Sequence, residues 1–162
     1  MEIRIAVAED ANQILEIYAP VVENTAISFE LCVPSLREIS NRIESYAKSH
    51  EWLVAESSGS LLGYAYATPH RSRDAYRHSV ETSVYIRDNS RERGLGKILY
   101  KELFKKLKDK EFHCAYAGIA LPNPASEALH QSVGFKPIGV FEEIGFKYDK
   151  WHDVSWYQRR IE

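Results

Sequence analysis

Residues 91–96 are the part of the sequence whose residue types most clearly suggest chemistry. They read Arg-Glu-Arg-Gly-Leu-Gly, and a lysine-rich amphipathic pattern follows at once. Glycine has no Cβ to keep a ligand from the backbone, and the first N–H groups of a helix are free donors at its positive end. Together with two guanidinium groups, this arrangement suits a pyrophosphate. The predicted phosphate-binding set is Arg91, Glu92, Arg93, Gly94, Leu95, Gly96 and Lys97.

The same loop, taken alone, is equally typical of a solvated turn ahead of a helix, so that alternative stays open. The pattern matches neither Gly-x-Gly-x-x-Gly nor the phosphate loop that ends in Lys-Ser/Thr. It therefore disfavours dinucleotides and nucleoside triphosphates as ligands.

Glu81 is the candidate general base, because it begins the strand that leads to this loop in an otherwise apolar and hydroxyl-bearing setting. A carboxylate held close to a reacting group can accept a proton from it. Partial burial would raise the pKa of the carboxyl toward the useful range. A glutamate at the start of a strand is, however, more often simply solvated.

The composition is that of an ordinary globular protein. The 162 residues fit one domain, 1–162, and 44% are hydrophobic and 27% charged. A formal net charge of −2 gives no electrostatic reason to expect nucleic acid or an anionic membrane as the main partner. The lysines of the helix after the glycine loop lie mostly opposite its leucines, which indicates a solvated face.

The N-terminal segment and the cysteines favour a cytoplasmic protein. The first ten residues lack the apolar core of a signal peptide, and no apolar run approaches the roughly 20 residues that span a bilayer. Cys32 and Cys114 lie far apart, so one disulfide is possible, but two reduced thiols fit better. No spacing of cysteines or histidines suggests a metal site.

The periodicity of apolar residues predicts an α/β fold. Strands are predicted at residues 3–7, 52–56, 61–68, 80–86, 114–121, 140–148 and 154–160. Helices are predicted from Asp10 to near Pro20, from Ser35 to Tyr46, and at residues 94–110 and 125–133. Residues 69–78 are a polar loop, and residues 149–153 connect the last two strands. This order predicts a mixed sheet with helices on both faces.

The segment from Val84 to Gly96 resembles the acetyl-CoA-binding motif of the GNAT N-acetyltransferases, a strand followed by Arg/Gln-x-x-Gly-x-Gly/Ala. Residues 123–135 resemble the second cofactor motif of that family, and the order of elements is similar along nearly the whole chain. A narrower resemblance, to the phosphinothricin and methionine sulfoximine acetyltransferases, is carried by residues 73–76, 80–85, 121–123, 129–130 and 151–154. The resemblance implies a mostly antiparallel sheet with splayed central strands.

The resemblance also assigns roles to residues. The pantetheine arm of acetyl-CoA would lie along the backbone of Val84, Tyr85 and Ile86, which would polarise the thioester carbonyl, and beside the amide of Asn123. Glu81 would be the general base. Residues that would read the acceptor are Phe29, Arg73, Ala75 and Tyr76. Simpler interpretations remain for each of these segments. Residues 84–86 fit an ordinary core strand, Asn123 fits a turn, and the loop that holds Arg73 and Tyr76 fits a solvated basic loop.

His130 departs from the wider family, in which many members place a tyrosine at this position to protonate the departing CoA thiolate. An imidazole titrates closer to neutrality and could serve as acid or as base. A single histidine on a helix is equally often structural. With a thiolate whose pKa is about 8.5, a dedicated acid is not required.

The predicted function is transfer of acetyl from acetyl-CoA to the amino group of a small amino acid or analogue. By resemblance the acceptors are phosphinothricin and methionine sulfoximine, which implies resistance to such compounds, with direct transfer in a ternary complex and no metal. The rival enzymes acetylate a polyamine or a protein N-terminus, and the non-enzyme rival is a CoA-binding sensor. Related enzymes often pair, so a homodimer is expected. The aromatic residues Trp151, Trp156 and Tyr157 would cover its interface or belong to the core.

Overall fold

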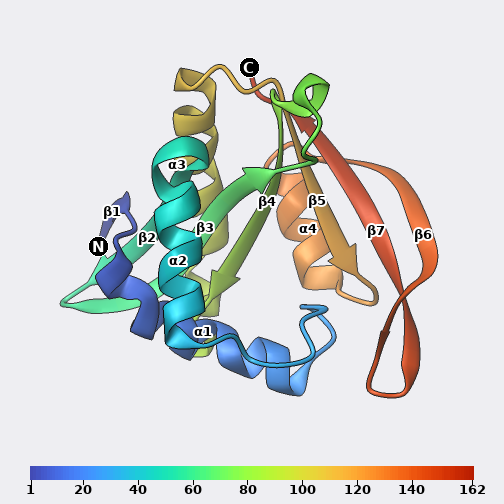
Figure 1. The fold of residues 1–162 in the computed structure, drawn as a ribbon, viewed down its shortest axis with the longest axis horizontal. Coiled ribbons are helices and arrows are strands. Elements are labelled where there is room, and N and C mark those ends of the chain that lie inside the picture. The colour runs from blue at the N-terminus through green and yellow to red at the C-terminus, as the bar shows by residue number, and fades with distance from the viewer.

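A seven-stranded sheet forms the centre of the computed structural model (Figure 1), in the order β1-β2-β3-β4-β5-β7-β6. The structure describes residues 1–162, apart from the side chains of Glu92 and Arg93. Only β4 and β5 are parallel neighbours; the other pairs are antiparallel. The predicted mixed sheet is confirmed. The strands are β1 (Glu2–Ile5), β2 (Trp52–Ser57), β3 (Ser60–Pro69), β4 (Ser79–Ile86), β5 (Cys114–Ala120), β6 (Lys136–Lys147) and β7 (Lys150–Arg160).

Two helices cover each face of the sheet (Figure 1), as predicted. On one face lie α1 (Ala11–Asn24) and α2 (Leu36–Tyr46), and on the other lie α3 (Leu95–Asp109) and α4 (Pro124–Ser132). The core is accordingly divided in two: Ile14 and Ile39 pack with β2 on the first face, and Leu99 packs with Val80 on the second. Successive residues of a strand therefore face opposite sides of the sheet, and each side is covered by a different pair of helices.

The two parallel strands separate after a short paired stretch. Their register includes only three pairs, from Ser79 opposite Cys114 to Glu81 opposite Tyr116. Beyond Glu81, β4 continues for five residues to Ile86 and β5 continues to Ala120. The expected splay of the central strands is thus present, and it begins at Glu81.

The first helix does not end near Pro20 as predicted but continues to Asn24. Proline has no N–H, so the helix loses one internal hydrogen bond there. The following Val21 and Val22 are buried against the sheet. Their burial offsets the lost bond, a tertiary effect that the local sequence does not reveal.

The connection between the last two strands is shorter than the predicted residues 149–153. Strand β6 runs to Lys147 and β7 starts at Lys150, leaving Tyr148 and Asp149 as the turn. Both residues have positive φ, 56° and 54°. Two consecutive residues with positive φ are the mark of a type I′ hairpin turn, which usually carries Asn-Gly or Asp-Gly. Tyr-Asp lacks that signature, which explains why the turn was missed.

Candidate active site

A groove of about 420 Å³ lies beside the end of β4, beyond the point where β4 separates from β5, and we call it the splay groove. It brings together three segments that the sequence analysis had singled out separately: the end of β4, the start of α3 and the start of α4. The predicted residues that line it are Val84, Tyr85, Ile86, Arg91, Gly94, Leu95, Gly96, Lys97 and Asn123. The side chains of Glu92 and Arg93, also predicted here, lie outside the described residues.

The start of α3 offers the splay groove unsatisfied backbone donors. Gly94, the cap of this helix, has φ of 64° and supplies no side-chain hydrogen bond to the first turn. Free N–H groups at a positive helix end, with Lys97 alongside, form a site for an anion. Arg91 also lines the groove and pairs with Asp88 at 2.8 Å. Gly96 lets α3 approach α4, since a Cβ there would lie 2.9 Å from Leu129 Cδ2.

Two hydrogen bonds determine which backbone groups of β4 face the opening. The Ser79 carbonyl accepts from the His70 N–H at 3.3 Å, and the Arg87 N–H donates at 2.8 Å to the Leu62 carbonyl. Residues on an antiparallel strand alternate in the side to which their backbone groups point. Odd-numbered residues of β4 therefore bond to β3, and even-numbered residues point toward the opening. The groups that face the opening are those of Thr82, Val84 and Ile86.

Asn123 has two roles in the structure. Its side-chain oxygen accepts a hydrogen bond from the Ser126 N–H at 3.1 Å and so caps α4. It also lines the splay groove. Because the oxygen is occupied by the cap, the amide N–H₂ is the part of Asn123 available to a ligand.

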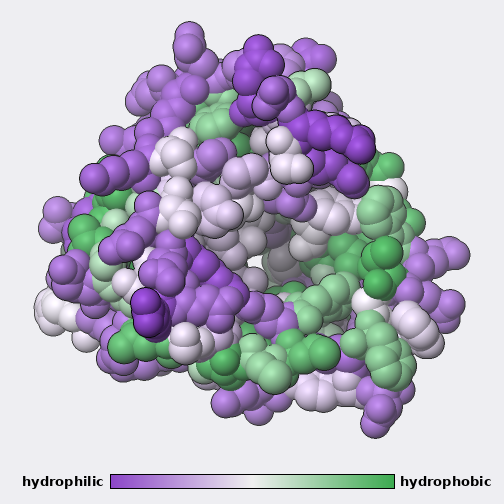
Figure 2. Space-filling model, viewed as in Figure 1, coloured by the Kyte–Doolittle hydropathy of each residue, from purple (hydrophilic) through white to green (hydrophobic). Residues whose placement is uncertain are grey.

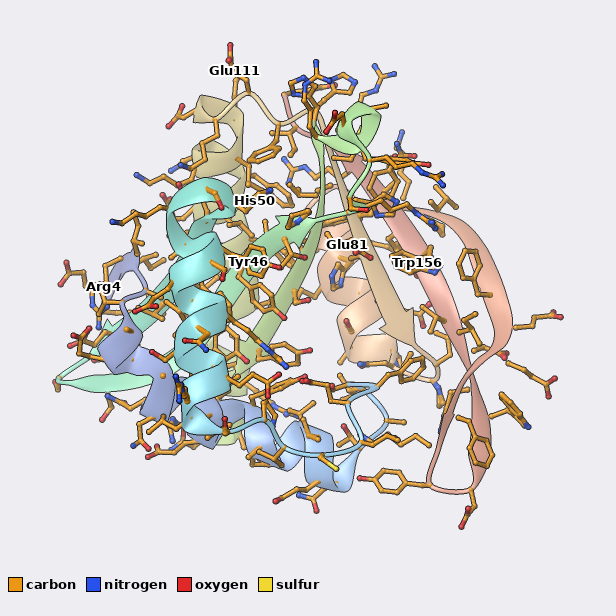
Figure 3. The ribbon with its side chains drawn as sticks, viewed as in Figure 1. Arg4, Tyr46, His50, Glu81, Glu111 and Trp156 are labelled. Carbon is orange, nitrogen blue, oxygen red and sulfur yellow. The ribbon has the colours of Figure 1, made fainter. Side chains whose placement is uncertain are left out.

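Glu81 lies between two cavities at the point where the strands part. The first, which we call the Glu81 cavity, has a volume of about 450 Å³, and the second, the loop cavity, about 640 Å³. Figure 2 shows this face of the molecule hollowed near its centre, and Figure 3 shows Glu81 and Trp156 on that part of the sheet. Both cavities are lined by Glu81, Phe141 and Trp156.

The environment of Glu81 suits a proton acceptor. Its side chain is 35% exposed, and burial raises the pKa of the carboxyl above its ordinary value, opposed by the charge of Arg71. The Glu81 cavity and the splay groove share Ile27 and Tyr85. The two spaces therefore adjoin each other, the groove lying against the helix end at Gly94 and the cavity against this carboxylate. A thioester placed in the groove and an amine placed in the cavity would be neighbours.

Two residues of the loop cavity were missed as site residues by the sequence analysis. His70 places Nδ1 3.9 Å from Glu81 Oε2 and stacks on Tyr116 at 5.0 Å, and this buried Nδ1 has no hydrogen-bond partner within the described part of the chain. Burial and the charge of Arg71 lower the pKa of the His70 imidazole. Arg71 also lines the cavity. The register between β3 and β4 is what indicates His70, because His70 directly follows β3 and its N–H bonds to Ser79 of β4, two residues before Glu81.

The four predicted acceptor-binding residues separate into two groups. Phe29 lines the Glu81 cavity and Tyr76 lines the loop cavity. Arg73 and Ala75 are exposed and line neither cavity. The structure thus brings two of the four to Glu81 and leaves the other two in solvent.

His130 lies inside the core rather than at either site. It is 4% exposed, and its Nε2 shares a hydrogen bond with the Tyr100 hydroxyl at 2.9 Å, while Nδ1 bonds to the Ser126 carbonyl at 2.7 Å. Burial lowers the pKa of its imidazole. The Tyr100 hydroxyl is in turn 3.5 Å from the Thr82 hydroxyl, which lines the Glu81 cavity. His130 thus contacts the two sites only through its neighbours, Tyr100 on the side of the Glu81 cavity and Ser126, which lines the splay groove.

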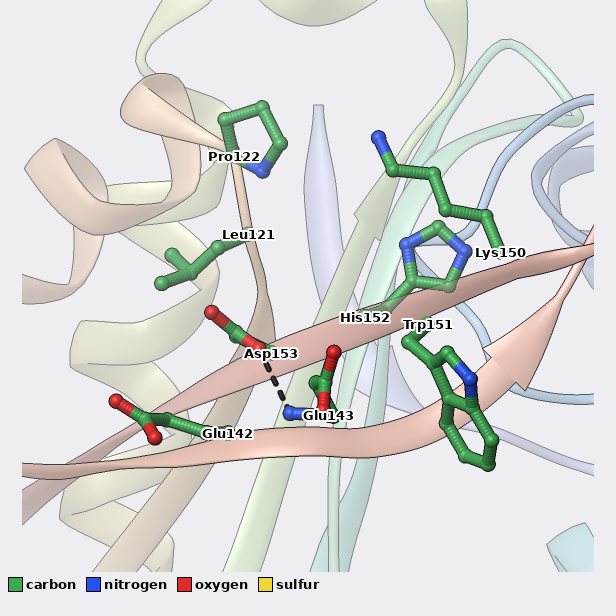
Figure 4. Close-up of a pocket in the computed structure, with 8 residues that line it drawn as sticks. All are labelled: Leu121, Pro122, Glu142, Glu143, Lys150, Trp151, His152 and Asp153. Carbon is green, nitrogen blue, oxygen red and sulfur yellow. Dashed lines mark hydrogen bonds between the residues drawn. The ribbon is translucent and has the colours of Figure 1, made fainter.

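A further cavity, of about 560 Å³, opens on the β6–β7 hairpin, and none of the predicted site residues lines it (Figure 4). Glu142, Glu143 and Asp153 line it, and the Glu143 N–H donates to Asp153 Oδ1 at 2.7 Å.

Among the side chains that the structure describes, no group of three or more is arranged to hold a metal ion. No helix of the described chain has the length and apolar character needed to cross a membrane.

Comparison with protein families gives one domain match. A model described as "Acetyltransferase (GNAT) domain" matches residues 3–156. A phosphinothricin N-acetyltransferase from Streptomyces coelicolor is 37% identical, over 99% of this chain and 96% of its own. An L-methionine sulfoximine/L-methionine sulfone acetyltransferase from Salmonella typhimurium is 32% identical, over 100% of this chain and 95% of its own.

Two solved structures share the fold along nearly the whole chain. A ribosomal-protein-alanine N-acetyltransferase from Brucella melitensis has a TM-score of 0.95 at 35% identity and covers 99% of both chains. A phosphinothricin acetyltransferase from Sinorhizobium meliloti, solved in complex with AcCoA, has a TM-score of 0.94 at 36% identity, over 99% of this chain and 88% of its own.

Proposed function

The chain belongs to the GNAT family of acetyltransferases, and from that membership we propose that it acetylates the amino group of a small amino acid or analogue. Phosphinothricin and methionine sulfoximine are the proposed acceptors, and acetyl-CoA is the donor. The observation that carries the proposal is that the splay groove at the end of α3 adjoins the Glu81 cavity, with Ile27 and Tyr85 lining both. The groove offers polar backbone and positive charge, and the cavity offers a carboxylate.

The proposed transfer is direct, with both substrates bound together. The diphosphate of acetyl-CoA lies on the first turn of α3, and its thioester carbonyl accepts from the β4 edge at Val84 or Ile86, where donors stabilise the developing oxyanion. The acceptor ammonium loses one proton to Glu81, the nitrogen attacks the carbonyl carbon, and the C–S bond breaks. The acceptor nitrogen loses a second proton as the amide forms, and the departing CoA thiolate takes up one proton. Neither Cys32 nor Cys114 lines these cavities, so no acyl-enzyme is invoked.

A panel of acceptors tests the proposal. Thiol release from acetyl-CoA is measured with phosphinothricin, methionine sulfoximine, spermidine and a peptide that begins with alanine. The proposal expects turnover with the first two. Turnover with none, despite tight binding of acetyl-CoA, would make the chain a CoA-binding sensor.

A protein N-terminus is the second candidate acceptor, because one close structural neighbour is named for that activity. Turnover confined to the peptide would select it. Spermidine is disfavoured, because the loop cavity presents Arg71 and His70, with Glu81 as the one acidic side chain among the described residues that line it.

The acidic end of an amino-acid acceptor is proposed to meet Arg71. We expect Arg71→Ala to raise the KM for phosphinothricin about tenfold or more, since hydrogen bonds to charged groups contribute roughly 1.5–3 kcal/mol. Arg73→Ala is the matched comparison, with an expected change below about threefold because Arg73 lines neither cavity. Steady-state kinetics on both variants measure the two KM values. A larger rise in KM for Arg73→Ala than for Arg71→Ala would identify Arg73 as the main residue that binds the acceptor.

His130 is proposed to act indirectly, by holding Tyr100. His130→Asn keeps a group that can bond to the Ser126 carbonyl but loses the bond to Tyr100. We expect kcat to fall by less than about tenfold, below the usual effect of removing a general acid or base. A much larger fall in a folded variant would instead identify His130 as the acid.

A homodimer is proposed to form through β6, the edge strand of the sheet. An exposed apolar edge is a template for pairing. Of the three predicted aromatic residues only Trp151 suits this interface, because its side chain is exposed, whereas Trp156 is half-buried and Tyr157 is buried. The exposed apolar residues of β6 are Ile138, Val140, Phe141, Ile144 and Phe146, and Trp151 of β7 lies opposite Phe146.

Light scattering tests the dimer. Phe146→Glu should convert the dimer into a monomer, because it places a charge in an apolar contact. Val7→Glu, at an exposed apolar residue beside β1 at the opposite edge of the sheet, is the control and should leave the mass unchanged. A wild-type protein that is already monomeric would remove the proposal.

A further inference from the structure

Lys147, at the end of β6, is a buried cation whose position the proposed reaction does not explain. The residue is 4% exposed. Its Nζ donates to two backbone carbonyls, those of Val22 and Ser28, at 2.8 Å each. Burying an ammonium is costly unless hydrogen bonds replace its water. The two carbonyls that replace this water therefore identify the part of the chain that Lys147 holds in place.

The two carbonyls belong to opposite ends of one short segment. Val22 lies in the last turn of α1, where carbonyls lack helical partners and the dipole favours a cation. Ser28 lies in the loop that follows. One ammonium thus ties the end of α1 to that loop and fixes residues 22–28 between its two bonds. Tyr148 adds a hydrogen bond to the Val22 carbonyl at 3.0 Å, from the same hairpin.

The held segment forms a wall of the Glu81 cavity. Ile27, Ser28 and Phe29 line that cavity, as does Ile144 of β6. Gly145 makes room for the ring, because a Cβ at Gly145 would lie 2.3 Å from Phe29 Cε2. Strand β6 therefore fixes the wall in two ways, by hydrogen bonds from Lys147 and by the space left at Gly145.

We propose that Lys147 is a positioning residue that holds the Phe29 segment against β6 and thereby sets which acceptors fit beside Glu81. Lys147 touches neither the acceptor nor acetyl-CoA. It acts on the width of the Glu81 cavity through the backbone at Ser28, one residue before Phe29. This inference rests on the proposed function, since it names the determinant of acceptor choice at that same site.

Replacement of Lys147 tests the proposal in kinetics. Lys147→Met keeps much of the side-chain length without the donors and should raise the acceptor KM about tenfold or more, since small misplacements of a binding wall are costly. At saturating acceptor kcat should stay within about threefold, because Glu81 is untouched. Lys147→Arg retains the donors and should restore part of the affinity. Lys136→Met, an exposed lysine at the other end of β6, is the matched control and should change neither constant.

A second variant reaches the same wall without removing the charge. Gly145→Ala displaces the Phe29 ring while Lys147 remains, so it should raise the acceptor KM and shift the preference among acceptors in the same direction as Lys147→Met. Opposite shifts, or an acceptor KM within about twofold of wild type in a folded Lys147→Met protein, would overturn the proposal.

Hydrogen exchange separates this inference from the proposed function, because it needs no substrate. Amides of residues 25–29 should exchange faster in Lys147→Met than in wild type or Lys136→Met, while β3 and β4 keep their protection. Unchanged exchange overturns the positioning role even if the enzyme acetylates amino acids. Faster exchange in a protein that acetylates no amine supports the role and refutes the proposed acceptors instead.

Discussion

Replacing Glu81 with glutamine is expected to lower kcat about 100-fold or more, because a positioned general base contributes roughly 10²–10⁴-fold to a rate. Glutamine keeps the shape and polarity of the side chain but cannot take a proton at neutral pH. The affinity for acetyl-CoA should not change, since Glu81 lines the two cavities beside the splay groove and not the groove itself. Single-turnover kinetics and calorimetry measure the two quantities separately.

The matched control is Glu2→Gln, an exposed glutamate that also begins a strand. It should leave kcat unchanged. If Glu81→Gln turned over at the wild-type rate, the amine would have to reach the thioester already neutral, and the assigned base would be wrong.

The pH dependence of the wild type follows from the same carboxylate. Burial raises the pKa of Glu81 above its ordinary value of about 4.3, and only the ionised form accepts a proton. The rate kcat/KM should therefore fall as pH drops through that raised pKa, and Glu81→Gln should lack this limb. The sign for stability is opposite. Because folding disfavours the charged form, this group destabilises the protein fully above its raised pKa, and the penalty fades as pH falls to the ordinary pKa of the unfolded chain, so Glu81→Gln should unfold at a higher temperature at pH 7.

The parts of the site that could be predicted from sequence are those that follow one another along the chain. Glu81, the end of β4 and the glycine loop form one strand, loop and helix, and each is recognisable from local chemistry. The position of Asn123 was likewise set by the two prolines beside it, which end a strand and start a helix.

The rest depends on contacts between distant parts of the chain. Lys147 bonds to the carbonyl of Val22, 125 positions away, and no local sequence pattern near either residue predicts that bond. The same holds for His70, whose importance comes from lying across the sheet from Glu81. For His130 the residue type suggested chemistry, but successive helical residues point about 100° apart. Leu129 faces the splay groove, and the next residue points to Tyr100 in the core.

Replacing Gly94 with valine is the second change with a large expected effect, and it acts on acetyl-CoA instead of the amine. Gly94 has φ of 64°, a region in which a side chain costs roughly 1–2 kcal/mol and a β-branched one more. Relief of that strain tilts the first turn of α3 and moves its free N–H groups. We expect the Kd for acetyl-CoA to rise about tenfold or more, since charge-assisted bonds to phosphate depend strongly on geometry.

Strain alone must be separated from loss of the phosphate site, and Gly59 in the turn between β2 and β3 allows this. Gly59 has φ of 80°, and a Cβ there, as at Gly94, would meet no atom within 4 Å. Gly59→Val should therefore lower the melting temperature as Gly94→Val does, while leaving acetyl-CoA binding intact. Equal affinities in the two variants would mean that the diphosphate does not lie on the end of α3. A selective loss in Gly94→Val would tie binding to the backbone of that turn, because no charged side chain has been changed.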